Sequence, residues 1–535
     1  MELRSFSSTR QRTSLPNLTP RNFTDNSSAM SKALRNPLIL DIIFSQLNNF
    51  DLRTARHVCR EWGDVGAGLL GKRAFFHVNQ LFRYNGSELY QVIPANDKLM
   101  RNLIIWDDFN PSVPSKKTAS VITKLFSELS SNVREFTREI AFYITLKKFA
   151  IAFLNGLRTL KSTTKIQHIS IFIQSTNPLV DKGRIQTLRK LPLQRNLTSI
   201  TFEIPPPIQE GGSGIHAFQP LLQVLIDSAP KLTSLDVTAS FLSLEGCRNL
   251  KVLKFLFANC NHEECHNFKL ASVATMLTSV KDSLIELELG YADVHVFSIG
   301  LIHDPQAGRY LDVPVMPNLV SLTITPLYVY PIQNFFDEKH FPKLRNVSLK
   351  KHQFEVIQLS SHLLNLWKPH RGVEYLALEA RDYCRDDRKF GETIVQLFPK
   401  VTKLEVALSQ CEDDVNEVVE PLKVLKLEEF KLVLWHVNVA SKLVKVLRSL
   451  AIWKGVKSVY FKWGCIEKAD FSASIQDIIL YSRGFKRVEI SGFVARDIVK
   501  VIRPIFEASG APVDFRGGVY RNMNFVIMVG GAVDL

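Results

Sequence analysis

The chain contains 535 residues, of which 46% are hydrophobic and 22% charged, and its formal net charge is +15. This length can bury a large core and corresponds to about three domains of ordinary size. No run of about 18 apolar residues occurs, and the opening residues lack a continuous apolar segment, so the sequence supports neither membrane spanning nor secretion. Lys and Arg are spread among acidic residues, so a dedicated nucleic-acid-binding surface is not indicated.

Residues 1–32 are rich in Arg and Ser and poor in acidic residues. Because this segment has no clear amphipathic helix, a disordered tail is favoured over a transit peptide. The seven cysteines are an odd and scattered set, which favours reduced thiols over a disulfide framework. We therefore expect a protein of the cytoplasm, the nucleus or both.

The first predicted helix begins after Asn36, which can cap it, with Pro37 at the first helical position, where its missing N–H costs nothing. The helix is apolar on two sides and so should have two partners. One side carries Leu40, Ile43, Phe44 and Leu47, and the other carries Ile39 and Ile42. A second helix, capped by Asp51, is predicted to follow. One side of it would carry Leu52, Ala55, Val58, Cys59 and Trp62.

An apolar pattern, L-x-x-L-x-L with aliphatic or aromatic variants, recurs twelve times, mostly 25 to 35 residues apart. The matches are IQHISI at 166, LTSITF at 197, LTSLDV at 232, LKVLKF at 250, LIELEL at 284, LVSLTI at 319, LRNVSL at 344, VEYLAL at 373, VTKLEV at 401, LEEFKL at 427, VKSVYF at 456 and FKRVEI at 485. Each is predicted to be a strand. More degenerate strands are expected in NLIIW at 102 and EIAFYI at 139.

The residues between several matches have apolar positions at helical spacing, at 218–228, 354–367, 441–451 and 474–482. It also occurs earlier, at 119–129 and 146–157. Proline precedes four of the strands, as in APKL at 229 and FPKV at 398, and would end the preceding helix because it cannot donate to the helix ladder. Each unit is therefore predicted to be a strand followed by a helix.

These units resemble the leucine-rich repeat family, in its longer and irregular form, over residues 98–500. The resemblance implies a curved solenoid with a parallel sheet on its concave face and helices outside. Residues 501–535 would cap the open end, with GGVYRNMNFVIMVGG at 517–531 as a terminal strand. Alternate strand positions point away from the core and carry both charges and tyrosine, which suits a protein-binding surface. The candidate substrate-binding residues are Glu286, Glu288, Tyr375, Glu379, Lys403, Glu405, Lys431, Tyr460, Lys462 and Arg487.

The predicted helices at 33–76 resemble the F-box, which docks substrate receptors of SCF-type cullin-RING ubiquitin ligases onto a Skp-type adaptor. The resemblance rests on the apolar helix ending in Leu47, on Asp51-Leu52 and on VCREW at 58–62, whereas Asn36-Pro37 stands in place of the family's usual Leu-Pro. It implies a small core and an adaptor-facing surface. These would be formed by Pro37, Leu38, Ile39, Ile43, Leu47, Leu52, Val58, Cys59 and Trp62.

Together the two resemblances imply an α/β protein with a tail at 1–32, a three-helix F-box at 33–76, a linker at 77–97, the repeats and a cap. The implied function is that of a non-catalytic substrate receptor, bound to the adaptor through its F-box and to a protein substrate through its concave face. No cofactor, metal, nucleic acid or membrane is expected to bind. A leucine-rich-repeat scaffold without a ubiquitin role, whose helical hairpin is only a cap, and a basic RNA-binding protein remain alternatives.

Two other motifs are interpreted as structural. GAGLLGK at 66–72 has the spacing of a phosphate-binding loop, but Arg73 replaces the required Ser or Thr and no strand precedes it, so the third F-box helix explains it better. CNHEECH at 260–266 resembles a metal cluster but lacks a second ligand pair, so a loop between repeats is favoured. No sequence motif of catalysis was found, so we expect no enzyme activity.

Overall fold

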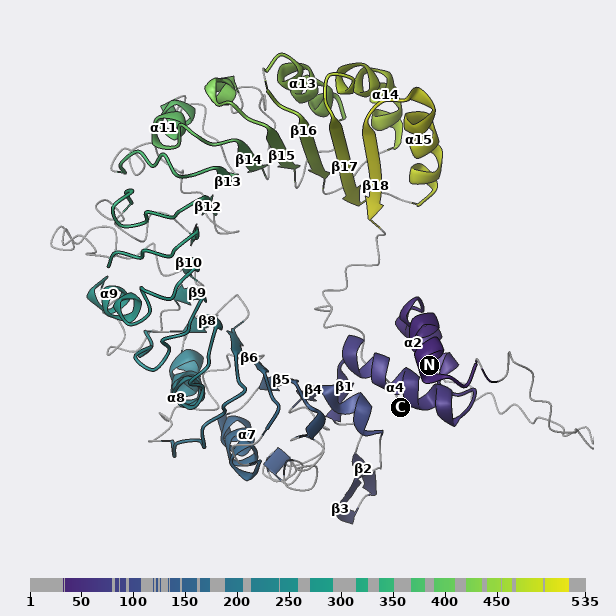
Figure 1. Ribbon diagram of the computed structural model, residues 1–535, viewed down its shortest axis with the longest axis vertical. Helices are drawn as coiled ribbons and strands as arrows, with labels where there is room; N and C mark the ends of the chain where they lie inside the picture. Colours follow the sequence, from purple (N-terminus) through teal and green to yellow (C-terminus); the bar gives the residue numbers. More distant parts are fainter. Residues whose placement is uncertain are drawn as a thin grey trace, which may run out of the picture. The chain divides into compact units, whose positions relative to one another are not determined.

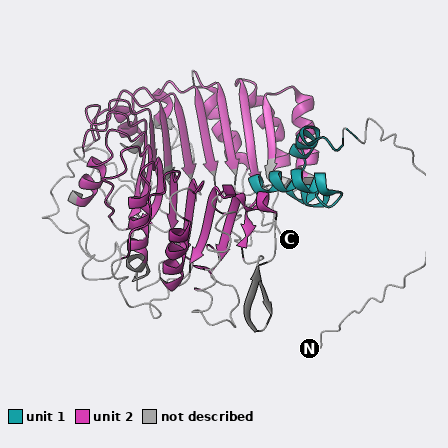
Figure 2. Cartoon of the chain, turned by 60° about the horizontal axis from the view of Figure 1, so that its bottom comes forward, with its two compact units in different colours: residues 1–73 teal, residues 74–535 magenta. Residues whose placement is uncertain are grey.

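The chain divides into two compact units, residues 1–73 and residues 74–535 (Figure 2), in a computed structural model. The described residues are 32, 34–78, 82–85, 87–92, 96–106, seven positions between 119 and 136, 137–144, 147–160, 164–173, 188–204, 213–239, 241–257, 270–291, 314–325, 336–350, 367–380, 389–408, 420–434, 440–453, 455–463, 468–493 and 496–518.

The described residues of the first unit include the helices α2 (Pro37–Ser45), α3 (Asn49–Ala55) and α4 (Arg60–Arg73). Helix α4 packs against both α2 and α3. Leu40 and Phe44 of α2 and Leu52 of α3 are fully buried in this unit. Because these side chains recur at helical spacing, each short helix gains its stability from packing rather than from its length.

In the part of the chain that the structure describes, the second unit is built on one sheet of sixteen parallel strands, which follow one another in chain order and curve as an open sheet (Figure 1). The strands are β1 (Phe76–His77), β4 (Asn102–Trp106), β5 (Glu139–Ile144), β6 (His168–Ile173), β7 (Ser199–Glu203), β8 (Ser234–Ala239), β9 (Val252–Phe257), β10 (Glu286–Tyr291), β11 (Ser321–Thr325), β12 (Asn346–Leu349), β13 (Tyr375–Ala380), β14 (Lys403–Leu408), β15 (Glu429–Leu434), β16 (Ser458–Trp463), β17 (Arg487–Phe493) and β18 (Val513–Gly518). A separate antiparallel hairpin is formed by β2 (Phe82–Asn85) and β3 (Ser87–Val92).

Helices cover the outer side of this curve, and the opposite side of the sheet, here called the concave face, carries none of the described helices (Figure 1). The α-helices are α7 (Lys147–Thr159), α8 (Ser213–Ser228), α9 (Leu270–Thr278), α11 (Lys389–Leu397), α13 (Ala440–Ala451), α14 (Lys468–Ser482) and α15 (Arg496–Ser509). The described residues also include the 3-10 helices η2 (Asp97–Arg101) and η9 (Glu420–Val424). Across the described residues, no helix has the length and apolar character needed to cross a membrane.

The repeat pattern accounts for the sheet. Within LTSLDV, for example, Leu232, Leu235 and Val237 are all buried, whereas Ser234 and Asp236 between them are half-buried on the concave face. All twelve matches contain a strand, so the predicted α/β fold with a curved parallel sheet is confirmed. The helices predicted at 146–157, 218–228, 441–451 and 474–482 are also present. The one predicted at 354–367 falls outside the described residues except for its last position, and most of 119–129 falls outside them as well.

The sheet begins before residue 98 and continues past residue 500. The two-residue strand β1 pairs with β4, and β18 pairs with β17 after helix α15. The predicted terminal strand at 517–531 overlaps β18 only at its first two residues, and residues 519–535 lie outside the described part of the chain. The edge of the described sheet is therefore β18 itself, whose Phe515 packs beside Phe471 and Phe506 of the two preceding helices.

Candidate functional site

Helix α2 has an apolar face that the unit does not bury. Asn36 caps the helix by accepting a hydrogen bond from the Leu38 N–H at 2.9 Å, and Pro37 occupies its first turn, both as predicted. Leu40 and Phe44 turn into the unit. On the other side lie four aliphatic side chains, here called the α2 apolar face. They are Leu38, Ile39, Ile42 and Ile43, with exposed fractions of 76%, 37%, 68% and 42%.

Two further large side chains of this unit remain in solvent. Phe50 of α3 is 75% exposed, and Val58, in the turn between α3 and α4, is 63% exposed. Single exposed apolar residues are common on protein surfaces, but four on one nine-residue helix indicate an interaction site. The helix thus has one partner inside the unit and a second face open to another molecule.

The second predicted helix is not continuous. Asn48, not Asp51, caps α3, because its side chain accepts hydrogen bonds from the N–H groups of Phe50 and Asp51 at 2.9 and 3.0 Å. Helix α3 ends at Ala55, and Trp62 belongs to α4. The predicted stripe therefore spans two helices and a turn, which explains why Val58 and Cys59 are exposed instead of packed. Apolar spacing alone does not show that a chain has turned between two helices.

Trp62 and Arg73 of α4 contact α2 and the residues that flank it. The indole ring of Trp62 meets Phe44 edge-on at 5.2 Å, and its Nε1 donates to the Leu34 carbonyl at 2.8 Å. The Arg73 guanidinium donates to the carbonyls of Leu47 and Ser45, both at 2.6 Å, and so satisfies the C-terminal end of α2. Helix α2 ends at Ser45, two residues earlier than predicted.

The GAGLLGK segment lies inside α4 and forms no loop, in agreement with its interpretation as helix. Gly66 is buried, and a Cβ atom placed there would lie 3.1 Å from the Cβ of Arg56 and 3.8 Å from Cδ1 of Leu52. Glycine at this position therefore allows α3 and α4 to approach closely. CNHEECH lies outside the described residues.

The nine residues implied to form the core and the adaptor-facing surface separate into two groups. Pro37, Leu38, Ile39, Ile43, Val58 and Cys59 are exposed, whereas Leu52 is buried and Leu47 and Trp62 are half-buried. Ile42 and Phe50 are missing from that set, although both are exposed. The helical spacing had already placed Ile42 on the second apolar side of this helix, where it lies one turn from Leu38 on the same face.

Strand register places the concave-face residues in rows across the sheet. One row runs through Ala377, Glu405, Lys431, Tyr460 and Glu489 in neighbouring strands. Within it, Glu405 accepts a hydrogen bond from the Tyr375 hydroxyl at 2.7 Å and forms an ion pair with Lys431 at 2.9 Å. Burial and the Glu405 charge raise the pKa of Tyr375, so its hydroxyl remains a donor. In the adjacent row, Lys403 pairs with Glu429 at 3.1 Å.

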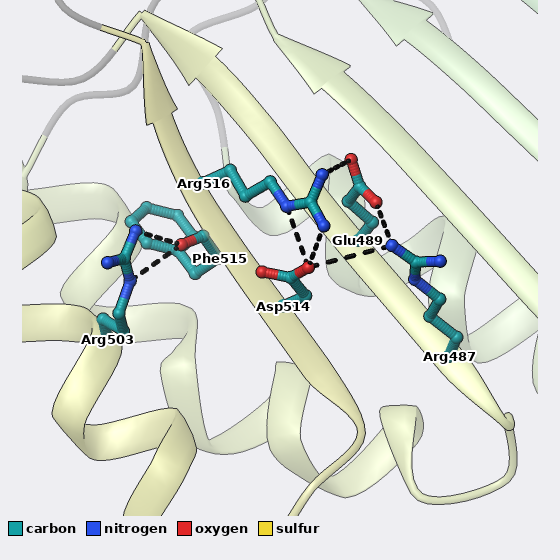
Figure 3. Close-up of polar contacts among 6 residues, drawn as sticks. All are labelled: Arg487, Glu489, Arg503, Asp514, Phe515 and Arg516. Atoms are coloured by element: carbon teal, nitrogen blue, oxygen red, sulfur yellow. Dashed lines mark hydrogen bonds and ion pairs between the residues drawn. The ribbon is translucent and has the colours of Figure 1, made fainter. Parts of the chain in front are cut away.

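Four charged side chains form a cluster at the β17–β18 end of the concave face (Figure 3). Arg487 contacts Glu489 at 2.8 Å and Asp514 at 3.8 Å, and Arg516 contacts the same two carboxylates at 3.3 and 2.6 Å. The Arg487 guanidinium also lies 5.6 Å from the centroid of the Tyr460 ring. Hydrogen bonds and these carboxylates raise the pKa of Arg516. The two arginines and two carboxylates pair with one another, so the cluster is nearly neutral overall.

The structure brings together most of the ten predicted concave-face residues but not all of them. Glu288 pairs with Lys350 at 2.8 Å, two strands away, and Glu286 is exposed one position before the core residue Leu287. The Glu379 side chain lies outside what the structure describes. Asp514 and Arg516 were missed because their strand has no L-x-x-L-x-L match and follows the predicted end of the repeats.

Aromatic and acidic side chains gather at the opposite end of the concave face, where sequence reasoning placed no site. Trp106, Tyr143 and Phe172 stack across β4, β5 and β6 with ring centroids 4.7 Å apart in each pair. Beside Phe172 in register stands Glu203, and Asp236 lies on the next strand. The alternate positions of NLIIW and EIAFYI carry the first two rings, which was the available signal.

No protein-family model matches the chain, and no curated protein matches it significantly. The residues that the structure describes contain no group of three or more His, Cys, Asp or Glu side chains placed to hold a metal ion.

Proposed function

We propose that the chain is a non-catalytic substrate receptor of a ubiquitin ligase. Its three-helix unit would act as an F-box that docks onto a Skp-type adaptor, and the concave face of its sheet would hold the protein to be ubiquitinated. The receptor would contribute proximity, because it brings substrate lysines near a charged conjugating enzyme. Such an enzyme would be recruited through the adaptor and a cullin-RING ligase.

The α2 apolar face is the observation that carries this proposal. A helix that merely capped a solenoid would present a polar outer face, as terminal elements of repeat proteins do. Helix α2 instead leaves Leu38 and Ile42 largely in solvent while Leu40 and Phe44 are fully buried. A helix with this arrangement can bind a second apolar surface. Helices that bind in grooves place their apolar anchors at the same i, i+4 spacing.

The concave face supports the second half of the proposal. It is a continuous set of parallel strands from β1 to β18, and its outward rows carry tyrosine, arginine and charges of both signs. Tyr and Arg are common anchors at protein interfaces. A mixed surface of this kind discriminates partners by electrostatic complementarity rather than by net charge.

Adaptor binding by the full chain tests the proposal. The purified chain would be mixed with a purified Skp-type adaptor and the complex isolated by size-exclusion chromatography. Leu38→Asp and Ile42→Asp should each abolish the complex, because both would place a charge within the apolar contact. Ile452→Asp is the matched control, since Ile452 is 78% exposed but belongs to the second unit.

The outcomes separate the receptor from a scaffold. Loss of the complex with both α2 variants, with the control still bound, would support the receptor. No complex with the unaltered, folded chain would instead favour a leucine-rich-repeat scaffold without a ubiquitin role.

A further inference from the structure

Strands β6–β17 begin at one edge of the sheet, because they are parallel and pair in register. The backbone continues the ladder there. The N–H of Lys251 donates to the Thr233 carbonyl at 2.8 Å, and the N–H of Ile285 donates to the Lys251 carbonyl at 2.8 Å. The same bond recurs from strand to strand up to Lys486, which donates to the Lys457 carbonyl at 2.8 Å. Residues that directly precede neighbouring strands therefore lie side by side along this edge.

A lysine or arginine occupies the turn before most of these strands, three or four residues ahead of the strand's first residue. In the first half of the sheet these residues are Lys165, Arg195, Lys231 and Arg248, in the turns before β6, β7, β8 and β9. All four are exposed, and none forms an ion pair with a described residue. Each turn thus adds one uncompensated positive charge to the edge.

The pattern resumes further along the sheet. Lys400, Lys426 and Arg483 occupy the turns before β14, β15 and β17. They too are exposed and have no ion-pair partner in the part of the chain that the structure describes. Together with the four residues before β6–β9, these three side chains are here called the basic rim.

Acidic side chains at the same edge do not neutralise the basic rim. Glu374 already pairs with Arg345 at 2.8 Å, and Glu428 pairs with Lys457 at 3.0 Å. The exposed Asp282 lies in the turn before β10, which carries no residue of the basic rim. Part of the chain's net charge of +15 is therefore concentrated on one edge of the sheet, whereas the charges at the β17–β18 end of the concave face pair with one another.

The four residues before each of these strands offer little besides charge and backbone. The apolar residue two positions before each strand is buried, as Leu232 and Phe485 are. Phe485 is the only aromatic residue at these positions, and among the described ones Ile285 is the only exposed large apolar residue, at 37%. Proteins bind single-stranded nucleic acid with aromatic rings that stack on bases, and bind membranes with apolar side chains that insert. Neither partner suits this edge.

The basic rim follows the curve of the sheet (Figure 1). Neighbouring strands lie about 4.8 Å apart, so the seven steps from Lys231 before β8 to Lys426 before β15 span about 34 Å. Double-stranded DNA is stiff over about 50 nm and resists such a curve. An extended peptide of about ten residues covers the same distance, with alternate side chains about 7 Å apart on one side.

We infer that the basic rim binds an extended, Asp- and Glu-rich segment of a protein partner. The segment crosses the turns from strand to strand, and its carboxylates meet Lys231 and Arg248 on one part of the curve and Lys400 and Lys426 on another. It supplies the negative charge that these side chains lack. This surface is separate from the concave face invoked in the proposed function, and binding to it needs no adaptor.

Fluorescence anisotropy with the full chain and no adaptor tests this inference. The probe is a labelled peptide of about 16 alternating Glu and Ser residues, which is long enough to span the rim, and the same peptide with Lys in place of Glu is the control. Lys231→Glu with Arg248→Glu should weaken binding of the acidic peptide by about tenfold and reduce its dependence on salt. Lys400→Glu with Lys426→Glu should do the same.

Lys445→Glu with Lys500→Glu is the matched control variant. Both residues are exposed on the outer helices, α13 and α15, and the change in net charge is the same as in each rim variant. Affinity for the acidic peptide should change by less than about twofold, because charges remote from the contact are screened by salt. Urea denaturation of all three variants should show equal midpoints, since every substituted side chain is exposed.

Three results would overturn the site: equal losses for the rim and helix variants, a loss confined to one of the two rim pairs, or no binding of the acidic peptide at low salt. A labelled single-stranded RNA of the same charge tests the other class of partner. RNA that binds more tightly than the peptide at the same salt concentration, and is lost in both rim variants, would assign the rim to nucleic acid and overturn the inference.

The adaptor experiment remains separate from this one. A chain that binds the acidic peptide but no adaptor would contradict the proposed function and leave this inference standing. A chain that binds the adaptor but not the peptide would do the reverse.

Discussion

Trp62 connects parts of the helical unit that are distant in sequence. Its ring packs on Phe44 of α2, and its Nε1 reaches the carbonyl of Leu34, which precedes that helix. The side chain is half-buried, so one part of its contribution comes from apolar contact and another from a single hydrogen bond. These two parts can be separated by substitution.

Trp62→Ala should destabilise the helical unit by about 2 kcal/mol, because it removes both the ring contact and the hydrogen bond. Trp62→Phe keeps most of the ring and should cost about 1 kcal/mol. Hydrogen exchange of the α2 and α4 amides in the full chain measures the difference. Equal protection in the two variants would contradict the packing described for Phe44 and Trp62.

Glu139 makes stability depend on pH in an unusual direction. Burial raises the pKa of its carboxyl, and the neighbouring His168, its register partner on β6, only partly opposes this. The folded chain therefore binds the proton more tightly than the unfolded chain does. The stabilising contribution is complete below the ordinary pKa of glutamate, about 4.3, and is lost as pH rises through the raised value.

Glu139→Gln should consequently raise the denaturation midpoint at neutral pH, and the gain should shrink as the pH approaches the ordinary glutamate pKa. Urea denaturation of the full chain at a series of pH values measures this. Glu245→Gln, at an exposed position, is the control and should change little. A gain that grows toward acid would show that the Glu139 carboxylate is stabilised in the fold.

At the scale of elements, the α3 boundary depends on one asparagine. Asn48 accepts two backbone hydrogen bonds, and its Nδ2 donates to the Asp51 carboxylate at 2.6 Å. The sequence analysis expected Asp51 to cap this helix, but Asn48, three positions earlier, is also a residue type that caps helices well. Propensity could not decide among them, because the choice depends on where the preceding chain turns.

Asn48→Ala should destabilise α3 by about 1 kcal/mol, whereas Asn48→Ser, which keeps an accepting oxygen, should cost little. Hydrogen exchange across residues 48–56 gives the readout. If Asp51→Ala has the larger effect of the two alanine variants, the cap would belong to Asp51 after all.

Gly290 marks a close approach within the sheet. It lies in β10 between Leu256 and Thr325 of the neighbouring strands, and an added Cβ would fall 2.5 Å from Leu256 Cδ2 and 2.7 Å from the Thr325 carbonyl oxygen. A backbone oxygen cannot move without disturbing the ladder.

Gly290→Ala should therefore lower the free energy of unfolding by about 1–3 kcal/mol, as overpacking does. Gly246→Ala is the matched control, because an added Cβ there meets nothing within 4 Å. Urea denaturation of both variants provides the comparison, and equal midpoints would contradict the close approach at β10.

At the scale of the whole molecule, the sequence predicted the strands correctly wherever the L-x-x-L-x-L pattern repeats. Twelve matches predicted twelve strands and their parallel order, because each repeat unit buries the apolar positions of its strand in the same way. The first and last strands of the sheet were harder to predict, because β1 has only two residues and β18 contains no match to the pattern. The stack of Trp106, Tyr143 and Phe172 was missed because it depends on register between strands, which no single strand's sequence specifies.

Calorimetric titration of a Skp-type adaptor into the full chain tests the receptor account most directly. If the α2 apolar face forms the contact, binding should show a negative heat-capacity change and little dependence on salt, and Ile42→Asp should eliminate it. Binding that disappears with added salt and survives Ile42→Asp would instead reflect the chain's positive charge. That result, or the absence of heat with the folded chain, would contradict the account.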